Sequence, residues 1–367
     1  MRVALIAPLF ESVPPRLYGG TERVVYNLCR GLTEADVEVT LFASGDSSAE
    51  GKIVPVTDEA FRLRKKPIND AVPYHLKMLK MVAARAEEFD IIHNHHDYWM
   101  LPLTEMTETP VVTTLHGRLD LPDISEAFAT YGKAHYISIS DAQREPLPKL
   151  KWARTIHHGI DVDALEFHEK PGKYLAFLGR IDFEKRPDLA IEIAMRAGVP
   201  LKIAAKIEGK AMQEYYDAMI KPHVDGKFVE YVGEISEAEK SEFLGNALAL
   251  CFPIDWPEPF GLVVVESLAC GTPVLARPYG SMPELLADGV TGYCHSDIKE
   301  LARRVADIPR IDRRICRKYV EDRFSLKRMT EDYINVYRHL ADFSSARRRK
   351  GGALIADHDR RHLLHSV

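Results

Sequence analysis

The first half of the chain alternates between short apolar runs and amphipathic stretches. Val3–Ala7 is a continuous apolar run, which is typical of a strand buried on both faces of a parallel sheet. From Thr21 onward apolar residues recur at helical spacing, and Val37–Ala43 then predicts a second strand. Further strands are predicted at Ile91–His93, Val111–Leu115 and His135–Ile139. This alternation predicts a doubly wound α/β domain over residues 1–168.

The same alternation restarts after residues 170–172, a turn-rich stretch suited to a linker. Strands are predicted at Tyr174–Leu178, Leu201–Ala205, Phe228–Val232, Ala247–Phe252 and Pro273–Ala276, and the clearest helices at Pro187–Ala197 and Gly261–Cys270. We therefore expect a second doubly wound domain over residues 169–325. Two such domains in series place a cleft between the carboxyl ends of two sheets, where open α/β folds bind ligands.

The C-terminal region divides into a helix and a tail. Apolar residues at helical spacing predict an amphipathic helix over residues 326–343. Residues 344–367 begin with a cluster of arginines and a lysine and end in a polar, His-rich stretch, which we interpret as a basic flexible tail. The tail and the basic, apolar stretch 74–88 are candidate peripheral membrane contacts. A solvated end and a surface helix packed on its own domain are the alternative interpretations.

Composition excludes several classes of protein. A net charge of −5 argues against a general nucleic-acid binder, whose phosphate contacts need a basic surface. No apolar run approaches the roughly 20 residues that cross a bilayer, and Glu11 and the Pro14-Pro15 pair interrupt the apolar start too early for a signal peptide. The five cysteines lie far apart, without zinc or dithiol spacing. We therefore expect a cytoplasmic protein, with any membrane contact on the inner face.

The stretch 257–272 carries the strongest chemical signal. Gly261 opens a predicted helix after a strand and a Pro-rich loop, and a helix N-terminus can hold a phosphate. Glu258 precedes this helix and Glu266 lies inside it, a separation of about 12 Å at the helical rise. That separation is too large for carboxylates flanking one bond. It suits a nucleotide sugar, whose hydroxyls at both ends can bind carboxylates.

This stretch resembles glycosyltransferase family 4, the retaining enzymes with the two-domain GT-B fold. The family hallmark is a Glu, seven residues and a second Glu, which matches Glu258 and Glu266 between Glu-Pro-Phe-Gly and Cys-Gly-Thr-Pro-Val. The resemblance covers essentially residues 1–340. It implies that Glu258 contacts donor-sugar hydroxyls and Glu266 the ribose. It also implies donor contacts from the amides of Phe260, Gly261 and Leu262.

Two cations follow the predicted strand Tyr174–Leu178. Arg180 and Lys185 lie in the stretch Gly-Arg-Ile-Asp-Phe-Glu-Lys-Arg-Pro, and cations at a strand end can neutralise a diphosphate and stabilise a leaving group. The resemblance implies that both bind the donor pyrophosphate, although Arg186 stands where the family usually has Gly. A solvated charged loop is the interpretation that the residues alone would equally support.

In the first domain, Gly19 and Gly20 lie at the entrance of the first helix. Paired glycines let backbone amides approach a ligand closely, and the resemblance places this loop opposite the donor phosphate and the acceptor. A Rossmann dinucleotide site would want three glycines tightly after the strand, and they are absent.

Three histidines follow predicted strands of the first domain. His116 should project into the cleft; alone it would be read as structural, but the resemblance places it near the donor sugar and the reaction centre. His93 and His95 belong to a denser cluster, which the resemblance makes acceptor-side residues. Metal ligation is the alternative for that pair, because they share a strand face. We predict no metal site.

Other family positions show departures. Ser140 and His158 fit positions near the interdomain edge, but His158 replaces the usual Asn before Gly-Ile-Asp. Residues 204–209 replace a more glycine-rich turn near the nucleotide. The sequence therefore assigns neither the donor base nor the sugar that is transferred.

Together these features predict a retaining glycosyltransferase that moves a sugar from a nucleotide-sugar donor to a hydroxyl of a glycan, lipid or small metabolite. We expect no cofactor and no metal requirement, because Arg180, Lys185 and helix amides can stabilise the leaving group, with His116 and Glu258 completing the predicted catalytic set. A sugar-nucleotide epimerase, a phosphorylase of the same architecture and a non-catalytic nucleotide-sugar-binding protein are the alternatives.

Overall fold

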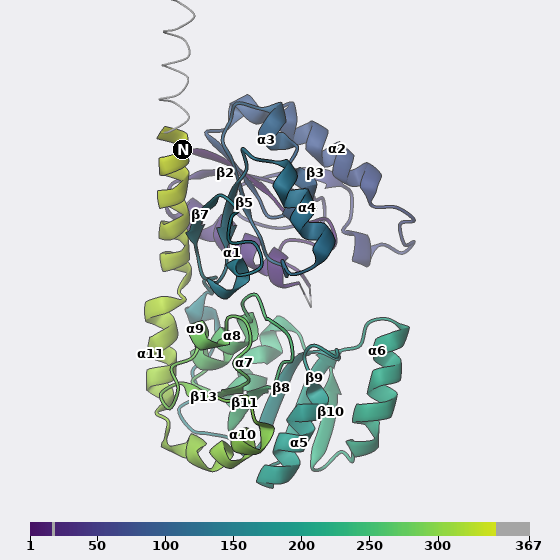
Figure 1. The fold of residues 1–367 in the computed structure, drawn as a ribbon, viewed down its shortest axis with the longest axis vertical. Coiled ribbons are helices and arrows are strands. Elements are labelled where there is room, and N and C mark those ends of the chain that lie inside the picture. The colour runs from purple at the N-terminus through teal and green to yellow at the C-terminus, as the bar shows by residue number, and fades with distance from the viewer. Residues whose placement is uncertain (17–18, 343–367) are drawn as a thin grey trace, which may run out of the picture.

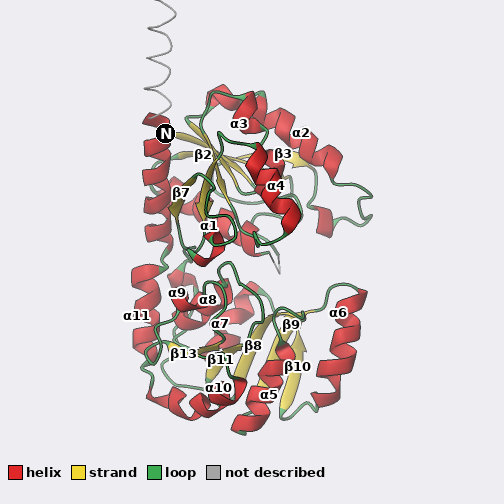
Figure 2. Ribbon diagram, viewed as in Figure 1, coloured by secondary structure: helices red, strands yellow, loops and turns green. Residues whose placement is uncertain are grey.

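Two parallel sheets, each flanked by helices, form the upper and lower lobes of the molecule in Figure 1, a computed structural model that describes residues 1–16 and 19–342. The first sheet has the order β3-β2-β1-β4-β5-β6-β7 and the second β10-β9-β8-β11-β12-β13. Figure 2 shows helices on the outer faces of both sheets. The prediction of two doubly wound α/β domains with a GT-B arrangement is confirmed.

The strands of the first sheet are β1 (Arg2–Ile6), β2 (Glu38–Ser44), β3 (Lys52–Thr57), β4 (Ile91–Asn94), β5 (Val111–Thr114), β6 (His135–Ser138) and β7 (Trp152–Thr155). Those of the second sheet are β8 (Leu175–Arg180), β9 (Leu201–Lys206), β10 (Val229–Gly233), β11 (Ala249–Phe252), β12 (Val274–Ala276) and β13 (Gly292–Cys294). The sequence did not predict β3, β7 and β13. All three are edge strands, which lack the continuous apolar run of a strand buried on both faces.

The helices of the first lobe are α1 (Gly20–Glu34), α2 (Val72–Ala83), α3 (Leu103–Met106) and α4 (Pro122–Thr130). Those of the second are α5 (Pro187–Ala197), α6 (Lys210–Tyr215), α7 (Glu237–Gly245), α8 (Leu262–Ala269), α9 (Met282–Leu285), α10 (Ile298–Arg304) and α11 (Arg313–Arg323). Short 3-10 turns occupy Phe61–Leu63, Ala86–Glu88, Asp97–Met100, Ala142–Arg144, Val162–Ala164, Lys221–His223 and Val305–Arg310, and a π-helical turn occupies Tyr216–Ile220.

The last helix, over residues 326–342, returns to the first lobe (Figure 1). Its side chains Met329, Tyr333 and Tyr337 are fully buried in the same apolar cluster as β1 and α1. The two segments that cross between the lobes pair with each other, because Ile160 accepts a hydrogen bond from the Leu326 amide at 2.9 Å and donates one to the Phe324 carbonyl at 2.9 Å. The first lobe is therefore completed by the end of the described chain.

The structure does not test the predicted membrane contacts of the stretch 74–88 and of the tail 344–367. Helix α2 buries Met78 and Val82 against the first lobe, whereas Leu76 is 59% exposed. The basic tail at 344–367 lies outside the described residues. Within residues 1–16 and 19–342, every helix falls short of the length and apolar content that a membrane span requires.

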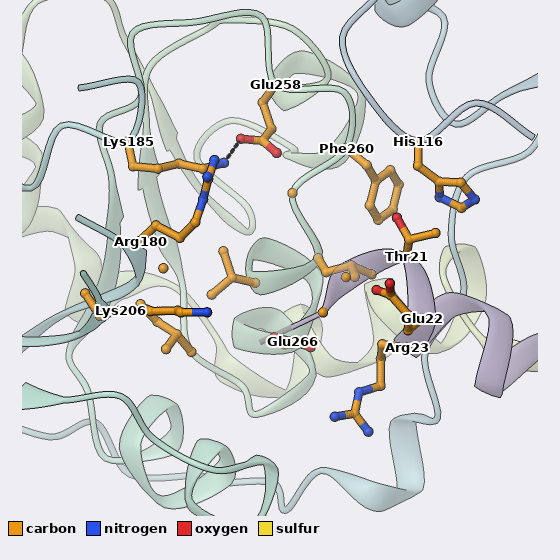
Figure 3. Close-up of a pocket in the computed structure, with 18 of the residues that line it drawn as sticks. Thr21, Glu22, Arg23, His116, Arg180, Lys185, Lys206, Glu258, Phe260 and Glu266 are labelled. Carbon is orange, nitrogen blue, oxygen red and sulfur yellow. Dashed lines mark hydrogen bonds and ion pairs between the residues drawn. The ribbon is translucent and has the colours of Figure 1, made fainter. Parts of the chain in front are cut away.

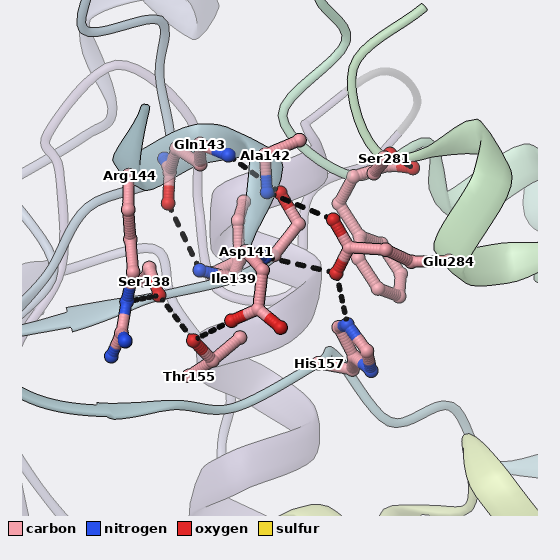
Figure 4. Close-up of polar contacts among 12 residues, drawn as sticks. Ser138, Ile139, Asp141, Ala142, Gln143, Arg144, Thr155, His157, Ser281 and Glu284 are labelled. Carbon is pink, nitrogen blue, oxygen red and sulfur yellow. Dashed lines mark hydrogen bonds and ion pairs between the residues drawn. The ribbon is translucent and has the colours of Figure 1, made fainter. Parts of the chain in front are cut away.

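A carboxylate joins the lobes beside the crossing segments (Figure 4). Glu284 of α9 accepts hydrogen bonds from the backbone amides of Asp141 and Ala142, both at 2.9 Å, and from His157 Nε2 at 2.9 Å. Burial opposes ionisation of Glu284, but these three donors outweigh it and lower the pKa of the carboxyl group. The contact holds the start of a first-lobe turn against the second lobe.

Candidate active site

A pocket of about 460 Å³ lies between the lobes and is lined by both. Eleven of the residues singled out in the sequence line it: Gly19, Gly20, His116, His158, Arg180, Lys185, Glu258, Phe260, Gly261, Leu262 and Glu266. Figure 3 shows Arg180, Lys185 and Lys206 on one side of this pocket and Thr21, Glu22, Arg23 and His116 on the opposite side. The motifs of both halves of the sequence therefore meet at one cavity.

The start of α8 forms the centre of the second-lobe wall. Gly261 caps this helix with a φ of +91°, in the left-handed region that favours glycine. Glu258 lies just before it, 8% exposed, and forms an ion pair with Lys185. The indole nitrogen of Trp256 donates a second hydrogen bond to Glu258 at 3.0 Å, and the Lys185 ammonium lies 4.8 Å from the centre of that indole ring. The tight turn thus holds a carboxylate and a cation beside the free amides of a helix start.

The second carboxylate, Glu266, is one turn into α8 and 5% exposed. It accepts a hydrogen bond from Lys240 Nζ at 2.8 Å, and Glu237 contacts the same ammonium at 3.0 Å. Burial opposes the charge of Lys240, but the two carboxylates outweigh it and raise the pKa of its ammonium. Glu266 is therefore a buried, paired carboxylate within the pocket lining.

Cations surround the space between these carboxylates. Arg180 ends β8, with its guanidinium 3.5 Å from Asp182, and extends toward Lys185 and Glu258 in Figure 3. Lys206 ends β9 and lines the same cavity. Ends of adjacent parallel strands meet at one edge of a sheet, which brings these cations together. The arrangement can neutralise a doubly negative group between two hydroxyl-binding carboxylates.

The first-lobe wall begins with the glycine loop before α1. A side-chain carbon added to Gly20 would lie 3.7 Å from Leu262 Cδ1, so this loop approaches the start of α8 across the pocket. Glu22, in the first turn of α1, is 6% exposed, and burial raises its pKa to about 7. The loop thus presents backbone and a weakly acidic carboxyl group to the pocket.

His116 is half-buried at the pocket, in the loop after β5. Gln143 braces this loop, since its side-chain amide donates to the carbonyls of Leu115 at 2.9 Å and Gly117 at 2.8 Å. The His116 ring stacks on His158 with 5.2 Å between ring centres, and His158 in turn packs on Phe260. Burial lowers the pKa of His116 to about 3, so its ring is neutral at physiological pH.

His93 and His95 lie behind His116 and are not part of the pocket lining. Both are buried, and His95 Nδ1 lies 2.9 Å from His116 Nε2. Only His95 contacts a lining residue, His116, and the acceptor-side role of both histidines stays a prediction. No group of three or more potential ligands is arranged to hold a metal ion within the part of the chain that the structure describes.

Three ion pairs span the two lobes around the pocket. Arg23 lies 3.0 Å from Glu237, Arg62 lies 3.7 Å from Glu208, and Arg118 lies 2.7 Å from Glu184. In each pair the first lobe supplies the arginine and the second supplies the glutamate. The sequence analysis assigned no role to Arg23, Arg62, Arg118, Glu237 or Lys240, because each owes its place to packing between elements. Glu184, Lys206 and Glu208 lie in stretches that it named, but their contacts across the pocket were not predicted.

Comparisons with known proteins agree with this geometry. The model for Glycosyltransferase Family 4 matches residues 18–164, and the model for Glycosyl transferases group 1 matches residues 163–322. The phosphatidyl-myo-inositol mannosyltransferase of Mycolicibacterium smegmatis is 27% identical over 327 residues, with 80% of each chain covered.

Solved structures show the same fold. AviGT4, a glycosyltransferase involved in avilamycin A biosynthesis, matches with a TM-score of 0.71 and 22% identity, over 93% of this chain and 98% of that one. HepE of Anabaena, in complex with UDP and glucose, matches with a TM-score of 0.70 and 17% identity, over 93% of this chain and 100% of that one. The two family models together span nearly all of both lobes, and the chain belongs to glycosyltransferase family 4.

Proposed function

We propose that this glycosyltransferase takes its sugar from a nucleoside diphosphate sugar held by the second lobe and passes it, with retained anomeric configuration, to a hydroxyl of an acceptor on the first lobe. One observation carries the proposal: Glu258 and Glu266 line a single pocket, with the free amides of the α8 start between them and cations beside them. An elongated donor with hydroxyls at both ends and a diphosphate in the middle fits this order of groups.

The charges support a reaction that needs no metal ion. As the bond between the sugar carbon and the phosphate oxygen breaks, its electron pair leaves with the nucleoside diphosphate. Arg180, Lys185 and the α8 amides then stabilise the growing negative charge, as a divalent ion does elsewhere. The acceptor oxygen bonds to the same sugar carbon from the face that the phosphate leaves, and the departing phosphate takes the acceptor proton. Contact between the lobes keeps water out, so that transfer competes with hydrolysis.

Two relatives suggest the first compounds to test. HepE was solved with UDP and glucose, which makes UDP-glucose a first donor to try, and the mycobacterial relative is named for a phosphatidyl-myo-inositol acceptor. A thermal-shift screen of nucleoside diphosphates and their sugars would identify the base, because a ligand that binds the folded state raises the melting temperature.

Lys185→Met and Glu258→Gln test the proposal directly. Each removes a charge from the pocket, and we expect kcat/KM for transfer to fall about 10²–10³-fold, the usual loss for one group that stabilises developing charge. Lys210→Met is the matched control, because the Lys210 side chain is 91% exposed on α6. Near-normal transfer by both pocket variants would overturn the assignment.

Further measurements test the finer parts of the proposal and distinguish it from a phosphorylase and from a non-catalytic binding protein. NMR of the product gives the anomeric configuration and tests retention, and transfer in the presence of EDTA tests metal independence. An absorbance spectrum detects the pyridoxal phosphate that a phosphorylase would be expected to carry. A non-catalytic binding protein would bind the donor but release no nucleotide with any acceptor.

A further inference from the structure

The indole ring of Trp256, half-buried in the pocket lining, is contacted by a cation from each lobe. Lys185, in the loop between β8 and α5, has its ammonium 4.8 Å from the centre of the ring. Arg118, in the first-lobe loop after β5, has its guanidinium 5.7 Å from the same centre and also pairs with Glu184 at 2.7 Å. Cations are attracted to the face of an indole. Both lobes therefore constrain the orientation of this ring.

The edge of the same ring binds the carboxylate of Glu258. Trp256 Nε1 donates a hydrogen bond to Glu258 Oε2 at 3.0 Å, and the Lys185 ammonium donates to that same oxygen. A carboxylate oxygen has two lone pairs, so these two donors occupy Oε2. Among residues 1–16 and 19–342, no side chain or backbone amide donates to Oε1. Figure 3 shows the bond from Lys185 to one of the two oxygens. Oε1 is therefore the oxygen that is left for a ligand.

The backbone that carries both side chains is restrained. Trp256 and Glu258 are each followed by a proline, Pro257 and Pro259, which disfavours helical dihedral angles at the residue before it. The Glu258 amide donates to the Trp256 carbonyl at 2.9 Å, and the Glu258 carbonyl accepts from the Ser281 amide at 2.9 Å. The indole N–H therefore loses little further freedom when it binds the carboxylate.

The two partners of Glu258 Oε2 differ in what a donor would do to them. Under the proposed function, the phosphates of the donor compete for the Lys185 ammonium and weaken its bond to Glu258. The indole of Trp256 carries no charge and has a single N–H, which already has its acceptor. Its hydrogen bond to Oε2 therefore persists when the phosphates bind, and Oε1 keeps its direction.

We infer that Trp256 is a positioning residue, whose N–H holds Glu258 Oε2 so that Oε1 stays available to the hydroxyls of the donor sugar. The role in sugar binding rests on the proposed function, whereas the hydrogen bond between Trp256 and Glu258 does not. A role confined to the sugar has a specific consequence. Loss of the N–H should weaken binding of a nucleoside diphosphate sugar but not binding of the nucleoside diphosphate alone.

Indole NMR tests the hydrogen bond on the full-length chain without ligand. The chain has three tryptophans, and Trp256→Phe assigns the Trp256 N–H signal by its loss from ¹H–¹⁵N spectra. Glu258→Gln replaces a charged acceptor with a neutral one, which makes a weaker hydrogen bond, so the Trp256 proton signal should move upfield. Glu266→Gln is the matched control, because Glu266 pairs with Lys240. A Trp256 signal that Glu258→Gln leaves unmoved, or that both variants move equally, would overturn the inference.

Calorimetry tests the role in sugar binding, with UDP and UDP-glucose as one pair of probes and GDP and GDP-mannose as the other. Trp256→Phe keeps an aromatic ring beside the cations but removes the N–H. For the pair that the wild type binds, we expect the Kd of the sugar nucleotide to rise about tenfold, as for the loss of one hydrogen bond to a charged group. The Kd of the nucleoside diphosphate alone should stay within about twofold.

Trp152→Phe is the matched control for binding. The Trp152 indole donates to the Leu147 carbonyl at 3.0 Å and is not part of the pocket lining, so its loss should change neither Kd. An equal rise in both Kd values in Trp256→Phe would indicate a general structural role and overturn the inference, as would unchanged binding of the sugar nucleotide. A wild-type chain that binds none of the four compounds would count against the proposed function, and the indole signals would still decide whether Trp256 holds Glu258.

Discussion

The two walls of the pocket carry their polar groups in opposite ways. The second-lobe wall is charged, and each of its buried carboxylates is already paired with a lysine, Glu258 with Lys185 and Glu266 with Lys240. The first-lobe wall is uncharged at His116, where a neutral ring is backed by two more buried rings. The second-lobe wall therefore holds buried carboxylates that are paired with lysines, whereas the first-lobe wall holds a neutral imidazole ring at His116.

This difference suggests how the site divides its work. On the charged wall, the donor that we propose would exchange partners with the existing pairs, its hydroxyls binding the carboxylates and its phosphates binding the cations. The first-lobe wall presents a neutral ring at His116, and its arginines Arg23 and Arg62 are already paired with glutamates of the second lobe. Charge-removing substitutions should therefore disturb the second-lobe wall more than the site around the His116 ring.

The largest expected effect comes from breaking a pair on the charged wall. Lys240→Met leaves Glu266 buried without its cation, and we expect the free energy of unfolding to fall by about 3 kcal/mol, the usual cost of an uncompensated buried charge. Lys202→Met is the control, because the pair of Lys202 with Glu230 is exposed and its loss should cost less than about 0.5 kcal/mol. Urea unfolding measures both. Equal losses in the two variants would show that the burial of Glu266 does not add to the cost of removing its lysine partner.

A smaller effect concerns the carboxyl group of the first-lobe wall. Burial raises the pKa of Glu22 from 4.5 to about 7, so the folded chain binds an extra proton between these values and becomes less stable as pH rises through them. Glu22→Gln removes this term. Relative to the wild type, the variant should gain about 2 kcal/mol in free energy of unfolding between pH 4.5 and pH 8.

Urea unfolding at the two pH values provides the measurement for Glu22. Glu34→Gln is a suitable control on the same helix, because its side chain is 56% exposed. A difference between wild type and Glu22→Gln that stays constant with pH would mean that the carboxyl group of Glu22 keeps an ordinary acidity and is ionised at pH 7.

The smallest effect is expected where the two walls meet. Glu184→Gln removes the partner of Arg118, a pair 2.7 Å apart in which both side chains are 32% exposed. We expect a loss below about 1 kcal/mol at low salt that disappears in 1 M NaCl, where the screening length is about 3 Å. Urea unfolding at both salt concentrations measures this. A loss that persists in high salt would indicate that Glu184 acts through packing and not through its charge.

Local patterns in the sequence were sufficient for most of the fold and part of the site. Helix α5 has the bounds that its periodicity predicted, and buried strands such as β1 agree to within a residue, because apolar runs reflect burial on both faces. The pocket carboxylates were also predictable, since one motif holds Glu258 and Glu266 on a single turn and helix.

Local sequence patterns could not predict contacts between elements that lie far apart in the chain. Lys240 meets Glu266 because α7 packs on α8, and no motif surrounds it. The partner of His93 is 244 residues further along the chain, on a helix whose spacing predicted only that it was amphipathic. The sequence therefore identified many of the residues that line the pocket but not the second layer of residues that supports them.

The return of the last helix to the first lobe has a mechanical consequence. The chain crosses between the lobes twice, and the crossings are tied together at Ile160 and Ser325. Two crossing segments joined by hydrogen bonds connect the lobes at one point, so opening the pocket would require the lobes to move about this point. An excised fragment ending at residue 168 would lose Met329, Tyr333 and Tyr337, and with them a side of its own core, so the first lobe is not a removable module.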